Sequence, residues 1–285
     1  MAYLAGDLLA DRNVLITGGG TGLGLAMGRR FLDLGASIVI CGRRQNVLDS
    51  AVDALKDAHP GKVSAHVCDI RSAEAVETMM DAIFAARPID ILINNAAATF
   101  IAQTHLLSAR AADAILGVTL HGALYCTLAA GRRWIEAKRP AVVLSILSTS
   151  TITGRAFTVP SSIAISGVLA MTRSLAVEWG PRDIRLVAIA PGSFPTPGAT
   201  AALNPESRKS ARANPALRVP LGRAGEHGEL ADMAAFLVSD AARYMTGEMV
   251  VLDGGGHLRT SGVEDLATWS DEQWTQHRER VLRKP

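Results

Sequence analysis

The chain has few cysteines and few aromatic residues, and it has no excess of charge of either sign. Its 285 residues include only Cys41, Cys68 and Cys126, an odd number without the C-x-x-C spacing of redox or zinc motifs. This argues against a disulfide framework. With 29 basic and 27 acidic residues, no overall field favours binding to nucleic acid or to an anionic membrane. Any recognition of charge must therefore be local.

Metal-binding and membrane-spanning patterns are also missing from the sequence. The seven histidines are scattered and form no H-E-x-x-H or comparable grouping, so we expect no metal site. The sequence has no uninterrupted apolar run of about 18 residues that would cross a bilayer. Residues 1–12 are too short and too mixed for a secretory signal. We therefore expect a cytoplasmic protein with neither a membrane nor a nucleic-acid partner.

Short β-branched runs alternate with longer stretches of helical period along most of the chain. Some short runs, such as 141–147, are apolar almost throughout, which is typical of strands that helices cover on both faces. Seven runs have the length and composition of strands: 13–16, 37–41, 63–69, 89–94, 141–147, 184–190 and 249–253. The pattern predicts an α/β fold: one domain with a Rossmann-like, doubly wound parallel sheet of seven strands.

The expected domain spans residues 1–260 and is followed by a helical tail over 261–285. A segment rich in Pro, Ala, Asn and Arg, at about 194–223, follows the sixth expected strand. Open α/β sheets bind ligands at that edge, so we interpret this segment as an insertion that covers the substrate. Two expected helices, over about 108–137 and 161–179, carry candidate catalytic residues.

A glycine-rich turn follows the first expected strand. Residues 17–24 read T-G-G-G-T-G-L-G and place Gly18, Gly22 and Gly24 before a stretch of helical period. Glycine is required because a Cβ would keep the backbone from approaching a pyrophosphate, whose charge is held by N–H groups at the helix N-terminus. Because the turn lies between a strand and a helix, it predicts a dinucleotide site rather than an ordinary tight turn.

The end of the second expected strand indicates which dinucleotide binds. An acidic residue there would bind the ribose hydroxyls of NAD, whereas a nearby arginine accommodates the 2′-phosphate of NADP. The chain reads Cys41-Gly42-Arg43-Arg44 and offers no acid. We therefore predict NADPH as the cofactor. The alternative is that Arg43 and Arg44 are a solvated pair in a loop.

Motifs spread over the chain resemble those of the short-chain dehydrogenases/reductases. After the glycine turn come Asp69-Ile70, Asn94-Asn95-Ala96-Ala97, Pro191-Gly192 and Asp253-Gly254-Gly255, in that order. The resemblance covers about residues 8–260. Local sequences such as Val159-Pro160-Ser161 are most similar to those of the 2,4-dienoyl-CoA reductases. The resemblance implies an NADPH-dependent reductase of fatty acid metabolism that acts on an unsaturated acyl-CoA and forms a homodimer or homotetramer.

The resemblance also implies which residues form the site. The residues implied to bind the cofactor are Gly18, Thr21, Gly22, Leu23, Gly24, Arg43, Arg44, Asp69, Ile70, Asn95, Ala96, Pro191, Gly192 and Thr196. Ser148 occupies the position of the wider family's catalytic serine, and Ser161 matches a serine of the dienoyl-CoA reductases. Three positions depart from those reductases: His121 replaces an Asn, Ser150 replaces a Tyr, and Ile165 replaces the Lys that would hold the nicotinamide ribose.

The lack of a Tyr-x-x-x-Lys pair bears on the reaction. None of the three tyrosines precedes a lysine by four residues, so no positioned acid protonates an alkoxide and ketone reduction is disfavoured. Conjugate reduction of an unsaturated thioester gives a delocalised enolate, which needs hydrogen-bond donors but can take its carbon proton from water. The candidate donors are His121, Ser148, Ser150 and Ser161. Alternatively, the serines are helix caps and His121 is a hydrogen-bonded core residue.

Three functional interpretations stay open. The first is an NADPH-dependent reductase of an unsaturated acyl-CoA or a similar conjugated carbonyl compound. Basic residues of the insertion would suit the phosphates of CoA: Arg208, Lys209, Arg212, Arg218 and Arg223. The second is an NADP(H)-binding protein without catalysis that acts by assembly or regulation, as the three departures suggest. The third is an enzyme of the same fold that acts on a specialised metabolite.

Overall fold

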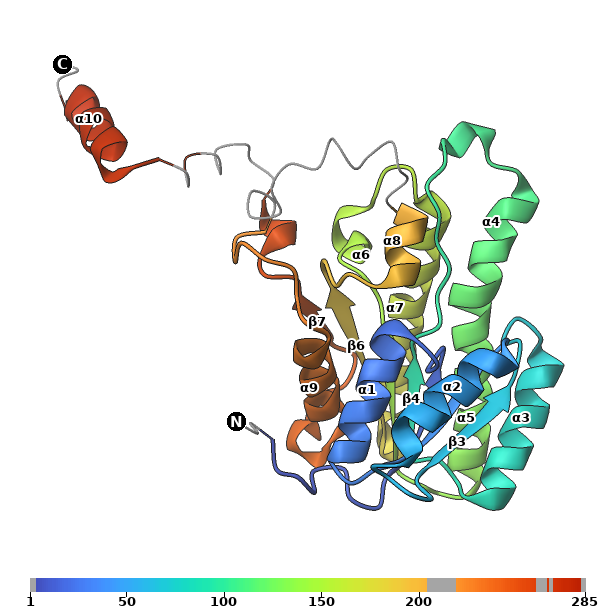
Figure 1. Cartoon of the computed structure of the whole chain (residues 1–285). Coiled ribbons are helices and arrows are strands. Elements are labelled where there is room, and N and C mark those ends of the chain that lie inside the picture. The colour runs from blue at the N-terminus through green and yellow to red at the C-terminus, as the bar shows by residue number, and fades with distance from the viewer. Residues whose placement is uncertain (1–3, 204–218, 260–265, 267–268, 283–285) are drawn as a thin grey trace.

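The protein folds around one parallel β-sheet with helices on both faces (Figure 1). The computed structural model describes residues 4–203, 219–259, 266 and 269–282. Within them the strand order is β3-β2-β1-β4-β5-β6-β7, and the strands β1 to β7 span Asn13–Thr17, Ser37–Gly42, Val63–Val67, Ile91–Asn94, Ala141–Ile146, Ile184–Pro191 and Met249–Leu252. The order reverses between β1 and β4, so the sheet is doubly wound. The predicted fold class and all seven predicted strands are confirmed.

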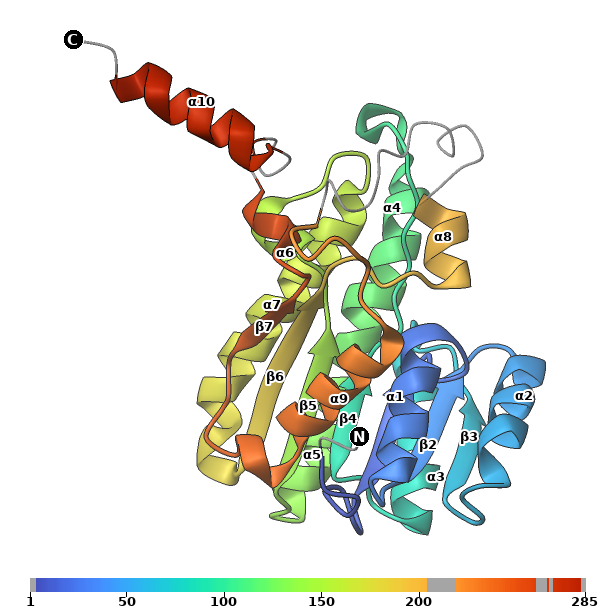
Figure 2. The same ribbon diagram turned by 60° about the vertical axis from the view of Figure 1, so that its left-hand side comes forward.

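Two helical layers cover the sheet (Figures 1 and 2). The helices of one layer are α1 (Gly22–Asp33), α2 (Gln45–Lys56) and α9 (His227–Val238), and those of the other are α3 (Ala73–Ala86), α5 (Gly122–Glu136) and α7 (Val159–Trp179). Successive side chains of a strand point to opposite faces. Leu15 and Ile16 of β1 are neighbours and both fully buried. Because they point to opposite faces, Ile16 packs in the apolar core under α1 and Leu15 in the core under α5.

The helix expected over 108–137 is interrupted by a wide turn. It consists of α4 (Ala109–Leu116), a π-helical turn over Gly117–His121, and α5. A π turn adds one residue to a helical turn, which rotates the side chains around it and is frequent at functional sites. Gly122 follows directly, and a Cβ there would come within 2.5 Å of the Ile70 side chain. The π turn decides which side chains of this helix face the carboxyl ends of the strands.

Two helical segments, Ala109–Glu136 and Val159–Arg182, are long and apolar enough to cross a membrane by length and composition. In this fold α5 and α7, which make up most of these segments, lie along one face of the sheet, and α4 extends past the carboxyl ends of the strands (Figure 1). Trp134 of α5 is fully buried, and its indole N–H donates to the Ile89 carbonyl at 2.7 Å. Apolar residues of these two helices are therefore part of the core of the protein.

The insertion and the tail are described only in part. The insertion begins with α8 (Pro197–Leu203), which lies above the carboxyl ends of the strands (Figure 1). Its basic residues Arg208, Lys209, Arg212 and Arg218 lie outside the described residues. The tail contains α10 (Asp271–Leu282), which stands apart from the sheet in both views (Figures 1 and 2).

Candidate cofactor and substrate site

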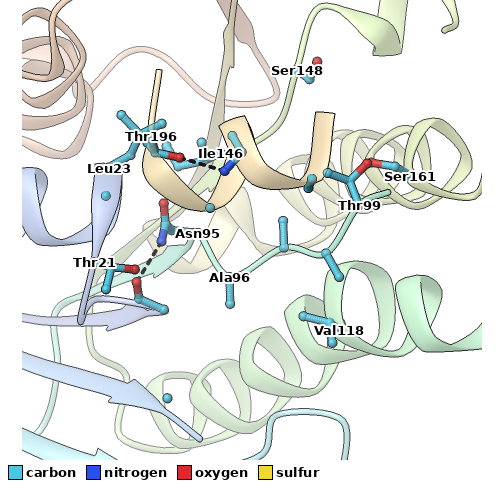
Figure 3. Close-up of a pocket in the computed structure, with 18 of the residues that line it drawn as sticks. Thr21, Leu23, Asn95, Ala96, Thr99, Val118, Ile146, Ser148, Ser161 and Thr196 are labelled. Atoms are coloured by element: carbon cyan, nitrogen blue, oxygen red, sulfur yellow. Dashed lines mark hydrogen bonds between the residues drawn. The ribbon is translucent and has the colours of Figure 1, made fainter. Parts of the chain in front are cut away.

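A cavity of about 640 Å³ opens at the carboxyl ends of the strands. Its walls come from the β1–α1 turn, the ends of β2 to β6, and the first turns of α7 and α8. This is the point where the strand order reverses, at which doubly wound sheets bind dinucleotides. Figure 3 shows Thr21 and Leu23 of the glycine turn on one side of the cavity, and Ser148 and Ser161 on the other.

The glycines of the turn stand where a side chain would clash or strain the backbone. Gly18 has a φ of +66°, and a Cβ there would lie 3.1 Å from the Ala96 Cα. A Cβ on Gly24 would lie 2.6 Å from the Gly18 carbonyl oxygen, which is closer than real Cβ contacts. Gly22 has a φ of +55° and faces the Thr196 side chain. The turn thus exposes backbone to the cavity at the start of α1, which fits a pyrophosphate.

Thr17 joins this turn to the end of β4. Its hydroxyl accepts hydrogen bonds from the backbone N–H groups of Asn95 at 3.0 Å and Ala96 at 3.1 Å. The Asn95 side chain in turn donates to the Thr17 carbonyl at 2.9 Å. These bonds keep the two cofactor-binding segments at a constant separation. Thr17 is not among the site residues predicted from the sequence, although its place between the strand and the glycines is visible there.

Arg43 and Arg44 line the end of the cavity beside β2, together with Cys41 and Cys68. Of the described residues that line the cavity, Asp69 is the one carboxylate. Arg71 donates to both its oxygens, with Nε at 2.9 and 3.0 Å, and this lowers the pKa of Asp69. This end of the cavity thus combines two arginines with a carboxylate that Arg71 already engages.

The thiols at this end of the cavity do not supply a nucleophile. Burial raises the pKa of Cys41 to about 12 and that of Cys68 to about 11. Since the thiolate is the reactive form, both side chains are neutral thiols at physiological pH. Their role at this end is packing.

At the opposite end, two serines form a polar pair. The Ser150 backbone N–H and the Ser150 hydroxyl both donate to the Ser148 Oγ, each at 3.3 Å. Because Ser148 accepts these two bonds, its own proton is left to donate to a ligand in the cavity. Ser161, in the first turn of α7, lines the same end.

Ile165 follows Ser161 by about one turn of α7. It lines the cavity but is only 4% exposed, and it packs in an apolar cluster with Leu147 and Val168. No lysine or tyrosine occurs among the described residues that line the cavity. Around Ile165 this end therefore offers serine hydroxyls, and its described lining includes neither a phenol nor an ammonium.

The structure does not bring His121 to the cavity, contrary to the sequence argument. His121 ends the π turn with an exposed side chain whose ring lies 6.0 Å from that of Tyr125. Val118 of the same turn lines the cavity, and Thr119 is buried and accepts a bond from the Ala98 N–H at 3.0 Å. The wide turn thus presents its earlier residues to the site and turns His121 outward.

The other predicted site residues, with one exception, line the cavity. They are Gly18, Thr21, Gly22, Leu23, Arg43, Arg44, Asp69, Ile70, Asn95, Ala96, Ser148, Ser150, Ser161, Pro191, Gly192 and Thr196. The exception is Gly24, which supports the turn from behind. Their roles stay predictions. The sequence argument did not single out Val118, Arg155 or Thr158, which also line the cavity, because no motif contains them.

Two further features bear on the predicted ligands. The described residues contain no group of three or more His, Cys, Asp or Glu side chains that could hold a metal ion. Arg223, the one basic residue of the insertion that is described, pairs with Glu229 at 2.6 Å and does not line the cavity.

Comparison with known proteins gives consistent matches over most of the chain. A family described as enoyl-(acyl carrier protein) reductase matches residues 18–257. A Bacillus subtilis protein named probable 2,4-dienoyl-CoA reductase is 38% identical, over 88% of this chain and 98% of its own. The crystal structure of a short-chain dehydrogenase from Bacillus anthracis is 36% identical with a TM-score of 0.78, over 88% and 98% of the two chains.

A further solved structure contains a cofactor. It is an Agrobacterium tumefaciens protein provisionally identified as a 2-deoxy-d-gluconate 3-dehydrogenase, with bound NADP. It is 30% identical to this chain with a TM-score of 0.79, over 90% of this chain and 100% of that one. The chain is thus similar both to proteins named as enoyl or dienoyl reductases and to proteins named as dehydrogenases.

Proposed function

The chain belongs to the short-chain dehydrogenase/reductase family, and we propose that it is an NADPH-dependent reductase of an unsaturated acyl-CoA or a similar conjugated carbonyl compound. The observation that carries this proposal is the contrast within one cavity. A glycine turn that fits a pyrophosphate lies at one end, and the Ser148–Ser150 pair without a tyrosine or lysine lies at the other. The relatives named as dienoyl-CoA reductases support the same substrate class.

The proposed cofactor is NADPH, which when bound supplies a hydride to the β-carbon or δ-carbon of the conjugated system. Arg43 and Arg44 hold its 2′-phosphate, the glycine turn holds its pyrophosphate, and Asn95 braces the turn. Ile165 stands where the family's ribose-binding lysine is expected and offers no hydrogen bond, so Ser161 or water would bond the ribose hydroxyls of a bound cofactor. The cofactor site thus departs from the family at this one contact.

Ser148 is the proposed donor to the carbonyl oxygen of the substrate. Negative charge grows on that oxygen as the hydride arrives, and a hydrogen bond that strengthens with this charge lowers the barrier. Ser150 keeps the Ser148 proton directed into the cavity by donating to its Oγ. The carbon proton comes from water, since the described lining offers no tyrosine or lysine. An alkoxide would need a stronger acid, so ketones are poor substrates.

The test is a comparison of substrates at saturating NADPH. We expect NADPH oxidation with a dienoyl-CoA or enoyl-CoA and little with simple ketones. Faster reduction of ketones would reject the proposed reaction. If NADPH binds tightly and nothing in a broad panel is reduced, the second interpretation, a non-catalytic NADP(H)-binding protein with an assembly or regulatory role, takes its place.

The proposed assembly is a homodimer or homotetramer formed through the long helices. Val177 of α7 supports this because its apolar side chain is 81% exposed on the single chain, and exposed apolar surface favours association. Light scattering of the purified protein tests the proposal. A monomeric mass at micromolar concentration rejects it.

A further inference from the structure

One charged side chain lines the substrate end of the cavity. Arg155 lies in the loop between α6 (Ser150–Thr153) and α7, and it lines the cavity together with Thr158 and Ser161. The other lining charges lie at the far end, where Asp69 is close enough to Arg43 for that arginine to lower its pKa. The reaction proposed above assigns no task to Arg155.

The loop that carries Arg155 has a well-defined backbone. Phe157 has a φ of +64°, which is unusual for a bulky residue, and its carbonyl accepts a bond from the Ala102 N–H at 3.0 Å. Such a conformation persists only where the surroundings determine it. The Arg155 carbonyl accepts bonds from the N–H and the hydroxyl of Thr158, each at 3.4 Å, and Thr158 is 3% exposed. The loop therefore presents Arg155 at a fixed point of the cavity wall.

Burial separates Arg155 from the reacting groups. Ser150 is 9% exposed, whereas the Arg155 side chain is exposed at the mouth of the cavity. A guanidinium at the mouth does not meet the charge that develops on the substrate carbonyl deeper inside. It meets a charge that the substrate already carries, and its planar set of donors matches a carboxylate or a phosphate.

We infer that Arg155 binds an anionic oxygen group, a carboxylate or a phosphate, that the substrate carries away from its reacting double bond. Arg155 is then a specificity-determining residue, which selects anionic substrates over neutral ones of the same shape. This inference rests on the proposed reductase function, because it takes the Ser148 end of the cavity as the place of reaction. It narrows the substrate class to anionic conjugated compounds.

The test measures ligand binding without turnover, by calorimetry on the full-length protein saturated with NADP⁺. Three probes are compared: coenzyme A for a phosphate, 2,4-hexadienedioate for a carboxylate, and 2,4-hexadienediamide as the neutral match of the latter. Arg155→Gln removes the charge and keeps a polar side chain. Arg243→Gln removes the same charge from an exposed arginine at the amino edge of the sheet, outside this cavity, and is the matched control.

We expect Arg155→Gln to weaken binding of at least one anion by about tenfold or more, the usual effect of losing a charge-assisted bond. The diamide and NADPH should bind as before, and Arg155→Lys should recover part of the loss. If the variant binds the dioate more weakly, the group that Arg155 recognises is a carboxylate. If it binds coenzyme A more weakly, that group is a phosphate. The inference is overturned if neither anion binds the wild type, or if Arg155→Gln weakens the binding of neither. It is also overturned if binding of the diamide weakens equally, or if Arg243→Gln has the same effect.

Kinetics separate this inference from the proposed reaction. With a conjugated substrate that carries the anionic group identified by calorimetry, Arg155→Gln should raise KM and leave kcat nearly unchanged, whereas the neutral counterpart of that substrate should show no change in either. If Arg155 had only a structural role, Arg155→Gln would instead lower the melting temperature of the protein and weaken the binding of NADPH. A wild type that binds anions through Arg155 but reduces no conjugated compound retains the anion site and rejects the reductase function.

Discussion

The two ends of the cavity are built from different parts of the chain. At the cofactor end, the wall is largely backbone, and added Cβ atoms at Gly18 or Gly24 would meet neighbouring atoms at 3.1 or 2.6 Å. At the substrate end, the wall consists of side chains, among them the Ser148–Ser150 pair and Ile165. The described lining of the cofactor end contains the glycine turn and other motifs that resemble the family's, whereas the described lining of the substrate end contains no tyrosine or lysine.

This difference follows from what each end must do. A pyrophosphate has one shape and is held by backbone N–H groups, so a side chain at the glycine positions of the turn hinders its approach. Donors at the substrate end need only the right position relative to the reacting oxygen, and hydroxyls of several residue types meet that need. The chemistry can therefore change while the cofactor stays the same.

The largest expected effect is at Ser148, because the proposed reaction depends most on its hydrogen bond. Ser148→Ala should lower kcat by roughly 10²- to 10³-fold, as loss of one oxyanion donor does, with NADPH affinity unchanged. Ser150→Ala should cost less, and the double variant should lose little more than Ser148→Ala alone because the two hydroxyls act together. Single-turnover rates with NADPH prebound measure this.

Ser50→Ala is the control for this series, since Ser50 is exposed on α2 and bonds only its own helix backbone, at the Asn46 carbonyl. Its rates should match the wild type. If the losses in kcat at Ser148 and Ser150 were additive, the two hydroxyls would act independently. That result would contradict the proposal that Ser150 directs the Ser148 proton.

The next effect concerns the cofactor end. Gly24→Ala places a methyl group 2.6 Å from the Gly18 carbonyl oxygen, so the turn must shift. We expect NADPH to bind at least about 100-fold more weakly, the scale on which a displacement of about 1 Å acts. Gly228→Ala is the control because a Cβ at that exposed position of α9 meets no atom within 4 Å. Equal NADPH affinities of the two variants would show that the turn does not hold the cofactor.

A smaller effect should separate the two nicotinamide cofactors. Arg43→Ala should lower the affinity for NADPH by roughly tenfold to a hundredfold, since it removes a charge-assisted bond to the 2′-phosphate. NADH affinity should change little. Calorimetric titration of the wild type and the variant with both cofactors measures the difference. Equal or tighter binding of NADH by the wild type would reject the cofactor assignment.

The sequence predicted the sheet and most of the cavity lining because their signals are local. Apolar runs mark the strands, and the glycines mark the turn. It did not predict the π turn over Gly117–His121, since a one-residue widening leaves no signature in apolar periodicity. It also missed Arg155, because the loop geometry that brings this residue to the cavity depends on a contact with Ala102 some fifty residues earlier.

The smallest expected effect tests that π turn. If the turn directs His121 outward as the structure shows, His121→Ala should change kcat by less than about twofold, because no hydrogen-bond donor to the substrate is lost. Thr119→Val is the informative partner. It removes the buried hydroxyl that accepts the Ala98 N–H and leaves that half-buried donor without this partner, at a cost of about 1 kcal/mol in stability. Thermal unfolding and single-turnover rates of both variants measure these effects. A fall in kcat of about 100-fold for His121→Ala, with NADPH affinity unchanged, would mean that His121 reaches the substrate in the working enzyme, so that this helical segment rearranges when ligands bind.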